Sequence, residues 1–198
     1  YVAGGPEDDH EGTRAADAIA RVRQGMKAML RLGSAWFDVA EQVKAVTEQG
    51  IDPRNFVLCT DDSHSGTLVN EGHMDRVLRH AMAQGLKPVT AIQMATLNTA
   101  QHFGREREIG SIAPGRLADF LVVSDLAQLK IDQVYARGVL AAEAGKLVID
   151  IPPYDYPESA RNTVHVGRTI EARDFDIKAP AGANEVRARV IGVIEKQA

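Results

Sequence analysis

The sequence feature that most constrains the fold is a short apolar run, Asn55–Cys59, between stretches with helical spacing. Turn residues bound this run, and an unbroken apolar run of this length is typical of a strand that is buried on both faces. Helical spacing predicts one helix before it, at Phe37–Gln49, and two after it, at about Leu68–Gln84 and Pro88–Phe103. Strands that alternate with helices predict a parallel α/β fold.

The N-terminal residues leave one alternative open. Thr13 is a candidate N-cap of a helix that ends near Gly25. The next run, Met26–Leu32, is compatible with more helix or with a buried strand, and its spacing does not decide between them.

The pattern changes near Gly104, after which strands are predicted in place of helices. A proline-rich connector, Pro152–Pro157, is compatible with neither a helix nor a central strand. The predicted strands are Asp119–Val123, a hairpin around Gly138, Leu147–Ile149, Thr163–Val166 and Val186–Ile194.

Composition narrows the classes of partner. The 198 residues carry a net charge of -4 and no basic block, so we expect no nucleic-acid partner. No apolar stretch approaches the roughly 20 residues that cross a bilayer, so we expect no membrane span. The N-terminus has no signal-peptide pattern, although it also lacks an initiating Met. The single cysteine, Cys59, fits a reducing cytoplasm, and in an apolar strand it is more typical of a packed thiol than of a nucleophile.

Two polar clusters could carry chemistry: Asp8–Glu11, directly before a helix, and Asp61–His64, directly after the buried strand. Active sites of parallel α/β folds gather at the carboxyl ends of strands. Imidazole and carboxylate ligands suit Zn, Fe or Mn, and one Asp could be both ligand and general base. Local turns and helix caps also explain the same residues and are the more common role for them, so spacing alone leaves both alternatives open.

Several segments resemble a known family. Asn98–Gly104 followed by Gly110–Val122 resembles the closing signature of the amidohydrolase superfamily. Three further segments are similar to sequence motifs of the adenine deaminase family within it: Asp8–Glu11, Leu58–Asp62 and Glu71–Arg79.

The resemblance implies a fold and its boundaries. Residues 1–103 would form the C-terminal part of a metal-dependent (β/α)8 barrel, about strands six to eight, with strand seven at Met26–Leu32. Residues 104–150 would form a β-sandwich portion. Residues 151–198 would be a linker and the start of a further C-terminal domain.

The resemblance also implies a reaction, the hydrolytic deamination of adenine to hypoxanthine and ammonia with a metal-activated water. His10 and Asp61 would bind the metal, which we expect to be Fe, Mn or Zn, and Asp61 would also carry protons. Asp62 is a second catalytic candidate, and Ser34 and His64 are candidate substrate-binding residues. We expect a purine as the small-molecule partner and a homo-oligomer.

One departure from the family pattern matters. The sequence contains no His-x-His pair, and on the family's register it begins at strand six. We therefore expect this chain alone to be inactive, and the absence of a bound metal is one alternative for it. The alternatives are another amidohydrolase, such as a cytosine deaminase or a dihydroorotase-like enzyme, and a non-catalytic folded fragment or assembly module.

Overall fold

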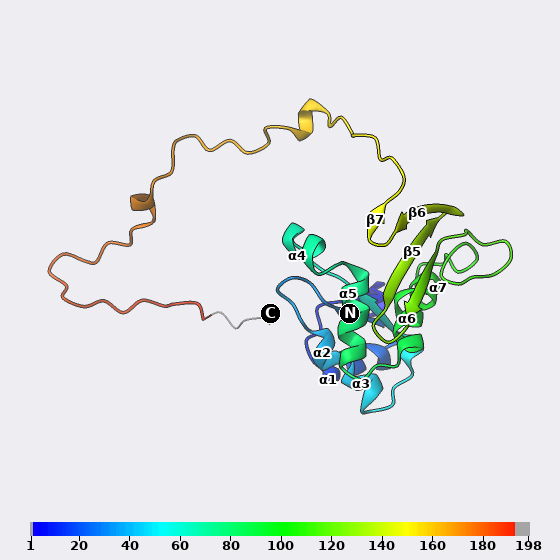
Figure 1. Cartoon of the computed structure of the whole chain (residues 1–198). Coiled ribbons are helices and arrows are strands. Elements are labelled where there is room, and N and C mark those ends of the chain that lie inside the picture. The colour runs from blue at the N-terminus through cyan, green and yellow to red at the C-terminus, as the bar shows by residue number, and fades with distance from the viewer. Residues whose placement is uncertain (1, 193–198) are drawn as a thin grey trace. The chain divides into compact units, whose positions relative to one another are not determined.

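The computed structural model describes residues 2–192 of the chain. Contacts between residues divide the chain after Ile149, and the two units, residues 2–149 and 150–192, are described separately. Figure 1 labels the helices and strands. Within residues 2–192, no helix is long and apolar enough to cross a membrane.

The first unit contains a parallel three-stranded sheet. Its strands are β1 (Asp8–Asp9), β2 (Lys27–Arg31) and β3 (Phe56–Cys59), in that order across the sheet. The apolar run at β3 is therefore confirmed as a buried strand. The run at Met26–Leu32 contains a strand, so the helix alternative is wrong. The burial pattern has the two-residue period of a strand: Ala28 and Leu30 are almost fully buried and alternate with side chains on the other face of β2.

Helices cover one face of this sheet. Helix α1 packs on β2, and α5 and α6 pack on β3. The shared core includes Leu30, Phe56, Val77 and Met94, all fully buried. The elements are η1 (Val2–Gly4), α1 (Ala15–Arg23), α2 (Val39–Gln42), α3 (Lys44–Thr47), η2 (Pro53–Asn55), α4 (Ser65–Asn70), α5 (Met74–Ala83), α6 (Pro88–Ala95) and α7 (Leu97–His102).

Each of the three long predicted helices is interrupted, so the prediction of single helices is wrong. The helix predicted at Leu68–Gln84 breaks at Gly72, which has a φ of +109°, and a Cβ there would lie 2.5 Å from an Asp75 carboxylate oxygen. The helix predicted at Pro88–Phe103 breaks at Thr96, whose backbone leaves the helical region. The helix predicted at Phe37–Gln49 is interrupted at Val43, where the Val46 N–H bonds three residues back instead of four.

The predicted N-cap of α1 is also wrong. Arg14 is the N-cap, and Thr13 precedes it. The Asp17 carboxylate accepts hydrogen bonds from the Thr13 and Arg14 N–H groups. Asp17, three residues after the N-cap, thus reaches back to the N-cap backbone, as the acidic residue of a capping box does.

A second, antiparallel sheet follows in the same unit. It contains β4 (Phe120–Asp125), β5 (Lys130–Ala136), β6 (Val139–Glu143) and β7 (Lys146–Leu147), in chain order. Strands β5 and β6 lie side by side (Figure 1), and they turn at Gly138, as the hairpin prediction required. Leu129, Val123 and Ile131 pack against the helical core. The second sheet is thus joined to the first by apolar contacts.

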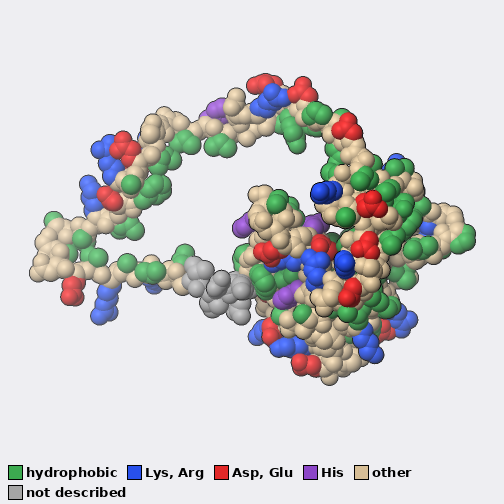
Figure 2. All heavy atoms as spheres, in the orientation of Figure 1, with side chains coloured by type: hydrophobic (Ala, Val, Ile, Leu, Met, Phe, Trp, Pro, Cys, Tyr) green, Lys and Arg blue, Asp and Glu red, His purple; other side chains and the backbone are tan. Residues whose placement is uncertain are grey.

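Residues 150–192 contain two short 3-10 helices, η3 (Glu158–Ala160) and η4 (Ala172–Phe175). The strand predicted at Thr163–Val166 is wrong, and so is the part of Val186–Ile194 up to residue 192; its last two residues lie outside the described part. Apolar side chains such as Ile177 and Val190 are exposed along this unit, mixed with charged ones (Figure 2). A strand needs a neighbour for its backbone groups, and the described residues of this unit provide none.

Candidate metal centre

Three potential metal ligands meet at the carboxyl edge of the parallel sheet. His10 Nε2 lies 3.9 Å from Asp61 Oδ2 and 3.3 Å from Glu11 Oε1. One ligand atom from each residue lies within 4.8 Å of the other two. The structure thus brings together the predicted pair, His10 and Asp61, and adds Glu11, which sequence reasoning noted only as part of a cluster.

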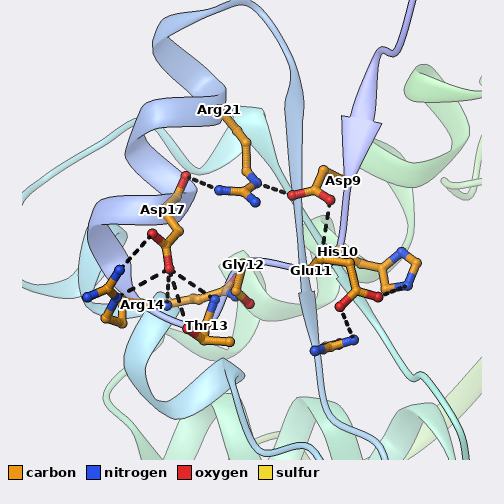
Figure 3. A network of polar contacts seen from close by, with 10 residues as sticks. Asp9, His10, Glu11, Gly12, Thr13, Arg14, Asp17 and Arg21 are labelled. Carbon is orange, nitrogen blue, oxygen red and sulfur yellow. Dashed lines mark hydrogen bonds and ion pairs between the residues drawn. The ribbon is translucent and has the colours of Figure 1, made fainter. Parts of the chain in front are cut away.

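The geometry of β1 directs His10 to this site. Asp9, the last residue of β1, forms an ion pair with Arg21 of α1, on the helix-covered face. Figure 3 shows the Asp9 carboxylate directed at Arg21 and the His10 ring directed away from it. Side chains alternate along a strand, so the residue after Asp9 faces the side opposite the helices. The Asp9 carboxylate also accepts the Glu11 N–H, at 3.2 Å, which fixes the start of the following loop.

A buried arginine lies directly beside these ligands. Arg31, at the end of β2, has a side chain only 3% exposed and contacts three carboxylates. Its Nη1 lies 2.6 Å from Asp61 Oδ2 and 3.1 Å from Glu11 Oε2, and its Nε donates to Asp38 Oδ2 at 2.9 Å. Burial lowers the pKa of Arg31, but the bonds to Asp38 and Asp61 and the charge of Glu11 more than offset this and raise it. Arg31 therefore remains cationic.

Sequence reasoning missed Arg31 and Asp38. The available signal was a charged residue, Arg31, within the apolar run Met26–Leu32. A charged side chain in a buried strand needs a partner, but the sequence does not say which one.

Both carboxylate oxygens of Asp61 are held in place. Oδ1 accepts the Asp62 N–H at 2.7 Å, and Oδ2 accepts from Arg31. Burial raises the pKa of Asp61, but these hydrogen bonds and the Arg31 charge outweigh it, and the pKa lies below its usual value. Asp61 is therefore an anion at neutral pH, which is the form that binds a cation or accepts a proton.

The other predicted site residues form a bridge between the loops after β2 and β3. The Ser34 N–H donates to the Asp62 carbonyl at 2.8 Å, and Ser34 Oγ accepts the His64 N–H at 2.8 Å. The Ser34 hydroxyl also donates to Thr67 at 2.7 Å. Gly33 permits this close approach, because a Cβ there would lie 2.8 Å from the Asp62 carbonyl oxygen. Ser34, Asp62 and His64 thus lie in two linked loops that follow Arg31 and Asp61.

Cys59, two residues before Asp61, is partly buried. Burial raises the pKa of its thiol to about 12, and the negative charge of Asp61 adds to the effect. A thiol in this state is a poor nucleophile, in agreement with the packed role that its apolar strand predicted.

The donor set fits a divalent metal ion. One imidazole nitrogen and two carboxylates are ligands that Zn, Fe and Mn all accept, and catalytic zinc sites commonly have three protein ligands. With His10 neutral, the carboxylates of Glu11, Asp38 and Asp61 and the Arg31 guanidinium leave this cluster two negative charges, which a divalent cation would balance.

Comparisons with known proteins show which family the chain belongs to. Residues 12–148 match the model of the amidohydrolase family. Over all 198 residues the chain is 80% identical to an adenine deaminase of Mesorhizobium japonicum and 73% identical to adenine deaminase 3 of Rhizobium meliloti. The chain spans about a third of the length of these curated relatives, 33% of each.

A solved structure supports the same fold. A β-aspartyl dipeptidase from Fervidobacterium islandicum AW-1 superposes with a TM-score of 0.54 over 71% of this chain and 37% of its own, at 20% sequence identity. That likeness concerns the fold alone, which is mixed α/β of the amidohydrolase type. The family match covers β2, β3, the second sheet and the helices between them, and the chain belongs to the amidohydrolase family.

Proposed function

We propose that this protein hydrolytically deaminates adenine to hypoxanthine and ammonia. The observation that carries the proposal is the meeting of His10, Glu11 and Asp61 at one sheet edge, in a chain 80% identical to part of an adenine deaminase. Members of the amidohydrolase family are metal-dependent, and this donor set suits a divalent ion.

His10, Glu11 and Asp61 would hold the ion. A divalent ion bound there would lower the pKa of a coordinated water toward neutrality. Asp61 is ionised and already oriented by two hydrogen bonds, so it can accept a proton at its carboxylate and release it to the leaving nitrogen.

The reaction balances with water alone. A bond forms between the water oxygen and purine C6, and the bond from C6 to the exocyclic nitrogen breaks. One water proton leaves on ammonia, and the other remains on a ring nitrogen of hypoxanthine. Neither an oxidant nor a reductant is required.

The roles of the surrounding loops are part of the proposal. Asp62 is proposed as a second catalytic carboxylate, and Ser34 and His64 as residues at the rim of the purine pocket. Their support is the hydrogen-bonded bridge that holds both loops next to Asp61. This bridge engages the Ser34 hydroxyl on two sides, so a contact with the purine would have to share it.

The proposal extends to the architecture. We propose that β1, β2 and β3 are strands six to eight of a (β/α)8 barrel, with residues 104–150 as a β-sandwich portion and 151–198 as a linker and the start of a further domain. Three parallel strands in chain order with intervening helices support the first part. We also propose a cytoplasmic homo-oligomer; the single cysteine supports a reducing compartment.

A substrate comparison tests the function. The complete gene product, loaded with Mn²⁺, would be assayed on adenine, cytosine and dihydroorotate. We expect hypoxanthine from adenine and at least about a 100-fold loss in His10→Gln and Asp61→Asn. Arg54→Met is the matched control, because Arg54 pairs with Asp52 in solvent before β3 begins, and it should retain wild-type activity. Faster turnover of cytosine or dihydroorotate, or full activity in Asp61→Asn, would contradict the proposal.

Residues 1–198 expressed alone provide a second comparison. We expect no hypoxanthine from them, because they correspond to a third of the length of the matched deaminases. Turnover that purifies with this chain and disappears in Asp61→Asn would show that these residues suffice.

A further inference from the structure

Arg31 is the one residue that contacts Asp61, Glu11 and Asp38 together among the ion pairs of the described residues. Its side chain is 3% exposed and that of Asp38 is 5% exposed, whereas that of Glu11 is 64% exposed. The Nε edge of the guanidinium is therefore fixed in the interior by Asp38, and its Nη1 reaches the two candidate ligands. The Trp36 ring lies beside the guanidinium, with Cζ 5.4 Å from the ring centroid.

The contact with Asp61 involves the oxygen that faces the metal site. Asp61 Oδ2, which accepts from Arg31 Nη1, is also the atom 3.9 Å from His10 Nε2. A carboxylate oxygen has two lone pairs, so one can accept from the arginine while the other points toward His10. Arg31 thus sets the direction of the second lone pair.

The positive charge of Arg31 acts on the three carboxylates that surround it. Without the guanidinium, three carboxylates would lie close together and repel one another, and the exposed Glu11 side chain would keep only its contact with His10. With it, the carboxylates remain together and keep an excess negative charge for a divalent ion.

We propose that Arg31 is a positioning residue, anchored by Asp38, that assembles the metal-binding edge before the ion binds. This inference rests on the proposed function, since it takes His10, Glu11 and Asp61 as the ligands. Arg31 acts through Asp61 and Glu11 and needs no contact with substrate.

The sign of one measurement separates this role from a simple charge effect. If Arg31 were only a cation near the site, its removal would reduce repulsion and tighten metal binding. If it positions the ligands, its removal weakens binding. Loss of a residue that orients metal ligands typically costs about 10- to 100-fold in affinity.

The experiment measures Mn²⁺ affinity in the metal-free complete gene product, by calorimetry or by competition with a chelator. The variants are Arg31→Met, Arg31→Lys and Asp38→Asn, with the exposed Arg54→Met as control. We expect binding to weaken about 10- to 100-fold in Arg31→Met, and lysine to restore little, because an ammonium cannot reproduce a planar two-sided contact. Asp38→Asn should weaken binding in the same direction, although Asp38 contacts neither His10 nor Asp61 in the ion pairs described.

Two further measurements are specific to positioning. Excess Mn²⁺ should restore part of the lost deaminase activity in Arg31→Met, because the defect lies in holding the ion. Asp38→Asn should add little to Arg31→Met in the double variant, because Asp38 acts through Arg31. If Arg31→Met does not fold, as judged by circular dichroism, Arg31→Lys decides, because it keeps the positive charge: a charge effect alone would leave Mn²⁺ binding unchanged, whereas loss of positioning weakens it.

The possible failures are distinct. Unchanged or tighter Mn²⁺ binding in the Arg31 and Asp38 variants, with loss of binding in His10→Gln, would overturn the role of Arg31 and leave the metal site standing. Unchanged binding in His10→Gln as well would overturn the metal site itself.

Discussion

Asn98 contacts the first residue of β3, the strand that ends two residues before Asp61, and its removal tests how that strand is held. The side chain is fully buried in α7. Its Nδ2 donates to the carbonyl of Pro53 and to that of Phe56, both at 2.8 Å, and its Oδ1 accepts from Gln93 at 3.2 Å. One amide therefore joins two helices to the first residue of β3.

The magnitude follows from what Asn98→Ala leaves behind. Two backbone carbonyls lose their Asn98 donor, and a buried acceptor left without a partner costs about 1–3 kcal/mol. Part of this is recovered where water reaches the partly buried Pro53 carbonyl. We therefore expect a loss of about 3 kcal/mol in unfolding free energy, which lowers Tm by about 6–12 °C for a domain of this size.

The assay is thermal unfolding followed by circular dichroism, with Asn70→Ala as the matched control. The Asn70 side chain makes one exposed hydrogen bond, to the Gly66 carbonyl, so its removal should change stability by no more than about 0.5 kcal/mol. A fall in Tm for Asn98→Ala as small as that for Asn70→Ala would refute the reasoning, because it would mean that the buried carbonyls find other donors without cost.

Two further predictions concern titrating groups. The pKa of the Cys59 thiol is raised to about 12, so only about one native thiol in 10,000 is ionised at pH 8. A disulfide reagent at pH 8 should therefore leave Cys59 unlabelled until the protein is denatured. Rapid labelling of the native protein would contradict the burial of this thiol. Burial raises the pKa of Asp75, but the His73 N–H and Arg79 outweigh burial and lower the pKa below the ordinary 3.8. Ionised Asp75 therefore stabilises the fold above pH 3.8, and this stabilisation is lost as the pH falls through the lower pKa of the folded protein. The difference in unfolding free energy between wild type and Asp75→Asn should therefore shrink between pH 6 and pH 3, and a constant difference would be the contrary result.

Local sequence was sufficient for the parts of the fold that depend on neighbouring residues. The strand at β3 and the hairpin around Gly138 follow from apolar runs and a turn residue. The helix interruptions at Gly72 and Thr96 were missed because apolar spacing continues across them. Their cause is backbone geometry, and at Gly72 a contact with Asp75, which spacing does not report.

The amino-acid sequence by itself determined the chemistry available at the site: imidazole and carboxylate groups placed next to strand ends, and a resemblance that assigned His10 and Asp61 to a metal. Only the tertiary structure decided that Arg31 contacts Asp61, 30 positions away, and that Glu11 and Asp38 join the same cluster. The physical reason is that strand register and alternation set which side chains meet across a parallel sheet. Arg31, Asp61 and Glu11 come from separate segments of the sequence, so no local sequence pattern predicts that their side chains meet.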